Sequence, residues 1–276
     1  MKQSDRYPGI RQAIWLLVLV SLLIVLLSIF VGILGEIIDV SLGEHPAVIA
    51  VLNLIAIGVI LMQSLKKTNA PFKDVFPLKP IQMLLLLPMV FTIIGVDILL
   101  SEMDNLFRTL LPVPKWIADF LSNLARGQTS LWGSIAILVV VAPLTEELLF
   151  RGLILRGFLS RYTVRKAILA SAILFGLFHL NPWQLLGAII LGVLFAWWFM
   201  QTGSLLPCLF GHAFSNAMLL IFTRVFRFNI PGLAGDLTKV EFQPIWLNLV
   251  ALLLTGSGIW ILTRMFRKAS TRRHAT

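Results

Sequence analysis

Residues 12–34 read QAIWLLVLVSLLIVLLSIFVGIL and contain no charged side chain. At a rise of about 1.5 Å per residue, such a run forms a helix long enough to cross the roughly 30 Å of hydrocarbon in a bilayer. The run follows several basic residues, as the apolar core of a signal peptide does, but it is too long for one and lacks a small-residue cleavage site. We therefore interpret it as a retained first membrane helix.

Similar apolar runs recur along all 276 residues, of which 58% are hydrophobic and only 13% are charged. These values lie far outside the range of soluble globular domains. The sequence predicts an all-α fold, a polytopic membrane helical bundle that forms a single membrane domain over residues 1–276. About eight spans are expected, near Gln12–Leu34, Ala47–Leu65, Ile81–Leu100, Leu131–Leu155, Ala167–Leu180, Trp183–Met200, Ser204–Thr223 and Ile245–Leu262. The fifth and sixth spans, joined at Asn181 and Pro182, are expected to form a tight helical hairpin.

The distribution of the 23 Lys and Arg residues predicts how the bundle is oriented. Most of them cluster at the N-terminus, after the second and fourth spans and in the C-terminal tail. By the positive-inside rule, both termini are therefore predicted to be cytoplasmic, which requires an even number of spans in a multi-pass protein of the cell membrane. The external segment Ser101–Ser130 mixes apolar and charged residues and is expected to form an interfacial amphipathic helix.

The net charge of +10 does not indicate a nucleic-acid partner, because the basic residues lie in short clusters between apolar runs. The lipid bilayer is the expected partner instead. The only cysteine, Cys208, lies in an apolar run, so no internal disulfide can form, and we interpret it as a small core hydrophobe.

The fourth span contains the densest group of charges in an apolar setting, with residues 142–152 reading APLTEELLFRG. Glu147 and Arg151 are four residues apart and share one helix face, so we expect an ion pair that lowers the insertion cost of both. Glu146 points about 100° away from Glu147. That direction makes Glu146 the natural general base for taking a proton from water.

Two later spans contribute further polar side chains at four-residue spacing. Phe175 lies one turn before His179 on the same face, where its ring could shield the imidazole from lipid. His212 and Asn216 also share a face, as hydrogen-bond donors to a developing oxyanion must.

The depth of these groups favours a common site. Counted from the cytoplasmic ends of their spans, Glu146, His179 and His212 lie at similar heights in the bilayer. Each residue taken alone also has a structural explanation, as part of a buried ion network, as a packed histidine or as an interhelical amide. Asp97, close to the external end of the third span, and Asn53 in the second are interpreted as structural.

Taken together, these residues resemble the CAAX protease and bacteriocin-processing (CPBP) family of intramembrane endopeptidases, and are similar to type II CAAX prenyl endopeptidases. The family pattern is Glu-Glu-x-x-x-Arg, Phe-x-x-x-His and His-x-x-x-Asn on successive spans. This sequence matches it within a catalytic core at residues 131–223, at Glu146, Glu147, Arg151, Phe175, His179, His212 and Asn216.

The resemblance implies an endopeptidase that cleaves a membrane-associated peptide or protein substrate, of CAAX type or another sequence. It implies that Glu146 and His179 activate a water molecule and that His212 and Asn216 hold the tetrahedral oxyanion. Glu147, Arg151 and Phe175 would support these groups.

Two questions stay open at this point. No cofactor is expected, but Glu146, His179 and His212 could instead bind zinc with water in the fourth position, as in a metalloprotease. The metal-free reaction is favoured because zinc ligation would remove Glu146 from its role as base. The competing functions are a non-proteolytic membrane scaffold or bacteriocin-immunity protein, and a proton-coupled transporter that uses the glutamates as a relay.

Overall fold

The computed structural model describes residues 7–40, 42–68, 70–118, 130–222, 230–233 and 239–274, and the regular structure within these ranges is entirely helical. The prediction of an all-α protein is confirmed. The chain divides into two compact units. The first comprises Met1–Lys79 and Thr129–Leu209, and the second comprises Pro80–Gln128 and Phe210–Thr276.

Six helices in the described part of the chain are long and apolar enough to cross a membrane. They cover Ile10–Ile37, Ala47–Thr68, Met83–Leu110, Leu131–Leu159, Pro182–Thr202 and Ile245–Ala269. The other two predicted spans correspond to α9 (Val164–Phe178) and α11 (Leu206–Leu220), each of 15 residues. At about 1.5 Å per residue, each of these two is shorter than the hydrocarbon layer. The protein is thus a multi-pass membrane protein with six candidate spans.

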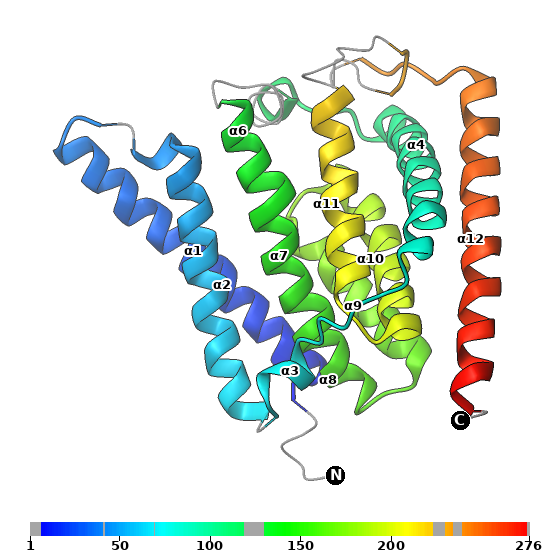
Figure 1. The fold of residues 1–276 in the computed structure, drawn as a ribbon. Coiled ribbons are helices and arrows are strands. Elements are labelled where there is room, and N and C mark those ends of the chain that lie inside the picture. Colours follow the sequence, from blue (N-terminus) through cyan, green and yellow to red (C-terminus); the bar gives the residue numbers. More distant parts are fainter. Residues whose placement is uncertain are drawn as a thin grey trace. The chain divides into compact units, whose positions relative to one another are not determined.

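The first unit contains two long helices and a broken fourth span, followed by a helical hairpin (Figure 1). Helix α1 contacts α2, and α2 contacts the fourth span. The elements are α1 (Ile10–Ile37), η2 (Leu42–Glu44), α2 (Pro46–Thr68), α3 (Phe72–Val75), α6 (Leu131–Ser134), η4 (Ile135–Val141), α7 (Ala142–Glu147), η5 (Leu148–Leu155), α8 (Arg156–Leu159), α9, and α10 (Pro182–Thr202).

The fourth span is not a uniform α-helix, because π-helical turns lie on both sides of α7. Pro143, at the start of α7, has no backbone N–H to complete the usual hydrogen bond to the preceding turn. The wider turn of η4 lies where that bond is lost. Short π-helical turns inside α-helices are frequent at functional sites, and here they flank Glu146 and Glu147 at the end of α7.

The predicted hairpin of α9 and α10 is confirmed. In the turn between the helices, the Asn181 side chain caps α10 by accepting a hydrogen bond from the backbone nitrogen of Trp183 at 3.1 Å. The helices approach closely, since a Cβ atom added to Gly192 would lie 3.0 Å from Ala172. This close packing fixes the position of the residues at the C-terminal end of α9.

The second unit contains η3 (Met83–Leu85), α4 (Leu86–Leu110), most of α11, and α12 (Ile245–His274). Helices α4 and α12 pack against each other along their length (Figure 1). Glycines make this approach possible. A Cβ on Gly95 would lie 2.5 Å from the Ala251 carbonyl oxygen, and one on Gly258 would lie 2.8 Å from the Pro88 carbonyl oxygen.

Helix α4 extends ten residues beyond the predicted end at Leu100, so that boundary was wrong. Polar side chains in the extra turns are hydrogen-bonded, which lets the helix continue past the apolar run. The Ser101 hydroxyl donates to the Gly232 carbonyl oxygen at 2.7 Å, and the Asn105 amide donates to the same oxygen at 2.8 Å. Of the predicted amphipathic helix at Ser101–Ser130, the first third therefore belongs to α4, and residues 119–129 lie outside the described residues.

We expect Gly258→Val to separate α4 from α12 and to lower the free energy of unfolding by about 1–3 kcal/mol, because the added methyl groups collide with backbone of α4. Gly256→Val is the matched control, since a Cβ at Gly256 meets nothing within 4 Å. Both substitutions change helix propensity equally. Denaturant unfolding in detergent should separate the two variants, and equal stability would contradict the proposed packing.

Candidate active site

A buried ion pair joins Glu147 and Arg151 in the fourth span. Arg151 Nη1 is 2.8 Å from Glu147 Oε1, and the two side chains are 1% and 0% exposed. Arg151 also donates a hydrogen bond to the Gly192 carbonyl oxygen at 3.4 Å, and its guanidinium lies 4.4 Å from the centroid of the Phe175 ring. The ion pair predicted from the four-residue spacing is confirmed, and it ties the fourth span to α9 and α10.

Glu146 points away from this pair and towards His179. Its Oε2 atom lies 4.0 Å from His179 Nε2, and the side chains are 16% and 24% exposed. The distance is too long for a direct hydrogen bond but short enough for both groups to contact one small molecule. His179 is the C-cap residue that follows α9, and the next residue, Leu180, has φ of 50°, a left-handed conformation that is strained outside glycine.

The orientation of the His179 ring is fixed by two contacts from Phe175. The Nδ1 atom lies 2.9 Å from the Phe175 carbonyl oxygen, and the two rings meet edge to face with centroids 5.0 Å apart. A carbonyl oxygen can only accept, so Nδ1 carries a proton in this contact. In the neutral ring, Nε2 is then the hydrogen-bond acceptor, and it faces the Glu146 carboxylate.

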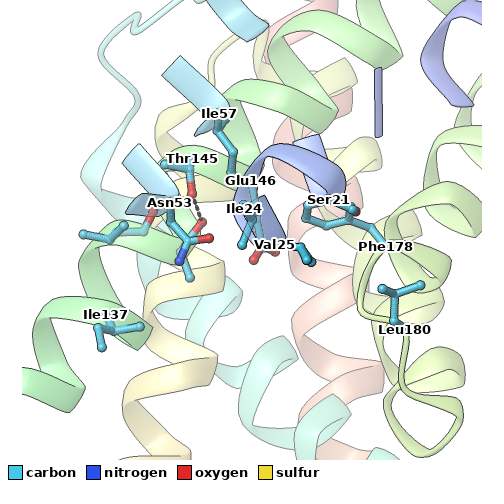
Figure 2. A pocket seen from close by; sticks show the side chains of 12 residues that line it. Ser21, Ile24, Val25, Asn53, Ile57, Ile137, Thr145, Glu146, Phe178 and Leu180 are labelled. Carbon is cyan, nitrogen blue, oxygen red and sulfur yellow. Dashed lines mark hydrogen bonds between the residues drawn. The ribbon is translucent and has the colours of Figure 1, made fainter. Parts of the chain in front are cut away.

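A cavity of about 270 Å³ opens beside Glu146 (Figure 2). Helices α1, α2 and α7, η4 and the end of α9 form its walls, and Phe178 and Leu180, the neighbours of His179, belong to the lining. The surface is mostly apolar. The complete lining is Ser21, Ile24, Val25, Asn53, Ile57, Ile137, Val141, Ala142, Thr145, Glu146, Phe178 and Leu180.

His212 and Asn216 lie on α11 in the second unit, His212 buried and Asn216 half-buried. Between them, the Ser215 hydroxyl donates a hydrogen bond to Asp97 Oδ1 at 3.0 Å. Asp97 is also close enough to His212 for their charges to interact. The sequence placed Asp97 at the external end of its span, but the longer α4 puts it near the middle of the helix, facing the histidine.

The structure brings together five of the seven predicted site residues, all in the first unit: Glu146, Glu147, Arg151, Phe175 and His179. His212 and Asn216 belong to the other unit, so their convergence with this group stays a prediction. The sequence predicts structural roles for Asp97 and Asn53. The only sequence feature of each residue is a polar side chain in an apolar span. That feature does not distinguish a packing role from a functional one unless the side chain that it contacts is known.

Residues 128–218 match the family model described as type II CAAX prenyl endopeptidase, Rce1-like. The matched segment is about a third of the chain and includes all three motifs, so the resemblance seen in the sequence is confirmed. No curated protein and no solved structure matches this chain. The match supports a hydrolase of the CAAX protease type and indicates a protease in general terms.

The zinc alternative needs three donors around one ion. Within the described ranges, no group of three His, Cys, Asp or Glu side chains is arranged to hold a metal ion. The first unit supplies Glu146 and His179, and the third predicted ligand, His212, belongs to the second unit. Zinc ligation by these three residues therefore stays an alternative to the metal-free reaction.

We expect Arg151→Met to destabilise the protein by about 3–5 kcal/mol, because it removes the guanidinium from a buried carboxylate. The double variant Glu147→Leu/Arg151→Met should recover most of that loss, since no buried charge is then left without its partner. Arg165→Met, at an exposed position, is the matched control and should change stability by less than about 0.5 kcal/mol. Unfolding free energies of the wild type and these three variants test this, and a double variant no more stable than Arg151→Met would contradict it.

Proposed function

We propose that this protein is an intramembrane endopeptidase in which Glu146 and His179 activate the attacking water. The observation that supports this most is the 4.0 Å separation of Glu146 Oε2 and His179 Nε2 beside a cavity lined mainly by apolar side chains of membrane helices. A carboxylate and an imidazole at this spacing can both contact one water molecule. The family match at residues 128–218 supports the same reaction class.

In the proposed reaction, Glu146 removes a proton from water while Nε2 of His179 orients the water as an acceptor. The hydroxide oxygen attacks the carbonyl carbon of the scissile peptide bond, and the carbonyl oxygen becomes an oxyanion. The proton held by Glu146 then passes to the amide nitrogen, the C–N bond breaks, and a carboxylic acid and an amine form. The acid then gives its proton to the Glu146 carboxylate or to solvent and leaves as a carboxylate.

We propose that His212 and Asn216 donate the hydrogen bonds that stabilise the oxyanion. Their four-residue spacing directs both side chains to one side of α11. In the same scheme, Asp97 steadies α11 through its hydrogen bond from Ser215. Glu147, Arg151 and Phe175 position Glu146 and His179 and do not react.

We propose a membrane-associated peptide or protein as substrate. The first candidate is the prenylated CAAX type named in the family description. A cavity within the bundle suits a substrate that is already held at the bilayer, and we place the enzyme in the cell membrane. Cleavage would occur on the cytoplasmic side. No observation here favours the scaffold, immunity-protein or transporter alternatives over this function.

Glu146→Gln is expected to lower the cleavage rate of a farnesylated CAAX-type peptide by at least about 10²-fold, because the amide cannot accept a proton from water. Unfolding temperature should be unchanged, since the substitution keeps the size of the side chain. Glu36→Gln, at an exposed position on α1, is the control and should retain full activity. The measurement is release of the C-terminal tripeptide by the purified protein in lipid nanodiscs, followed by mass spectrometry.

Turnover by Glu146→Gln equal to that of the wild type would rule out this base. A scaffold predicts no cleavage and tolerance to substitution of Glu146, His179 and His212, while a transporter predicts flux in vesicles without peptide product. Treatment with a zinc chelator should leave the rate unchanged. Loss of activity that added zinc restores would instead assign Glu146 to a ligand set.

We also propose eight spans with both termini cytoplasmic, counting the 15-residue helices α9 and α11 with the six longer ones. In a Cys208→Ala background, a cysteine at Thr271 should react with a membrane-impermeant maleimide only after the cells are permeabilised. A cysteine at Glu241, in the predicted external loop, should react in intact cells. The opposite labelling pattern would invert the orientation. Labelling of both sites in intact cells would place them on the same side, so that α12, the one helix between them, does not cross the membrane.

A further inference from the structure

The cavity beside Glu146 has two walls, which are formed by different parts of the chain. Glu146, Thr145 and the residues around His179 lie within residues 128–218, the segment that matches the protease family. The remaining wall is formed by α1 and α2, which lie outside the match. Any group of this second wall that binds substrate is therefore a property of this chain and does not follow from the three motifs.

Two polar side chains belong to this second wall, Asn53 of α2 and Ser21 of α1 (Figure 2). The Asn53 amide donates one hydrogen bond to the Ile49 carbonyl oxygen at 2.9 Å. Within the described residues this is its only hydrogen bond, so its side-chain oxygen and second amide hydrogen stay available. The Ser21 hydroxyl makes none within those residues, although a serine inside a helix commonly bonds to the carbonyl one turn back.

Available polar groups in an apolar setting are costly unless a ligand pairs with them. A carboxamide donates and accepts at adjacent atoms, which is the pattern that a peptide group of a substrate presents in return. The neighbouring Ile24, Val25 and Ile57 provide an apolar surface for a substrate side chain. At about 270 Å³, the cavity is smaller than most drug-sized ligand sites, and its size suits one or two residues of a peptide.

We propose that Asn53, assisted by Ser21, binds a peptide group of the substrate next to the scissile bond, so that α1 and α2 select the substrate that Glu146 and His179 cleave. This inference rests on the proposed peptidase function. It assigns a backbone-binding role to the amide and an aliphatic side-chain site to the apolar residues around it.

A hydrogen bond made equally in the bound substrate and in the transition state changes KM and leaves kcat unaltered. For a farnesylated CAAX-type peptide, Asn53→Leu should raise KM by about tenfold and Ser21→Ala by about threefold, with kcat within about twofold of the wild type. Asn53→Gln keeps the carboxamide and should recover part of the affinity. Ser28→Ala, on α1 outside the cavity lining, is the matched control and should leave both constants unchanged.

The decisive measurement compares peptides that are N-methylated in turn at each amide flanking the scissile bond. Methylation of the amide that Asn53 accepts from should raise KM with the wild type and with Ser28→Ala. It should have little further effect with Asn53→Leu, because the hydrogen bond is already lost. The inference would be overturned if Asn53→Leu and Ser21→Ala had the KM of the wild type. It would also be overturned if the effects of methylation and of Asn53→Leu on KM multiplied at every methylated position.

Glu146→Gln, assayed in parallel, separates the two proposals. If it loses cleavage while Asn53→Leu and Ser21→Ala keep wild-type kinetics, only the substrate-binding role is refuted. If the wild type does not cleave the peptide, the proposed function with this substrate is refuted and the binding role falls with it. If Glu146→Gln cleaves as fast as the wild type, the role of Glu146 as base is refuted, and the KM effects still test the binding role. An unchanged unfolding temperature for Asn53→Leu confirms that a KM effect does not come from misfolding.

Discussion

A charge inside an apolar helix bundle needs a counter-charge, because an isolated one costs about 2.5–3.5 kcal/mol on insertion scales. The Glu147–Arg151 pair meets this requirement at 2.8 Å, with both side chains almost fully buried. The guanidinium also contacts the Phe175 ring and the Gly192 carbonyl oxygen. One ion pair thus holds the fourth span, α9 and α10 at a common point in the first unit.

The position of this pair determines where the neighbouring carboxylate can point. Successive side chains on a helix diverge by about 100°, so fixing Glu147 towards Arg151 directs Glu146 to another side of α7. That side holds the cavity and His179. Phe175 connects the two functions, since its face contacts Arg151 while its carbonyl oxygen and ring orient the His179 imidazole. Structural and chemical roles are therefore divided between two adjacent glutamates.

Local geometry explains how much of this could be predicted from the sequence. The six long helices follow from long, mainly apolar runs, and the Glu147–Arg151 pair follows from spacing on one helix. The approach of Glu146 to His179 depends on how the fourth span packs on α9. Counting residues along each helix predicts the height of a side chain in the bilayer, but it does not predict the distance between side chains on two helices. The end of α4 was misplaced for a related reason. Its last polar turns are stabilised by hydrogen bonds to the Gly232 carbonyl oxygen, more than a hundred residues away in the chain.

The same reasoning explains why the sequence predicts only structural roles for Asn53 and Asp97. A single polar residue in an apolar span has no local partner to indicate its role, and its meaning depends on another helix. Asp97 faces α11 through Ser215, whereas Asn53 shares a cavity with Glu146. The motifs lie in one segment, and α1 and α2 complete the cavity from outside it. The reacting groups and the opposite wall come from separate parts of the chain. Substitutions in α1 and α2 can therefore change the shape and polarity of the cavity without disturbing the contacts that hold Glu146 and His179 in place.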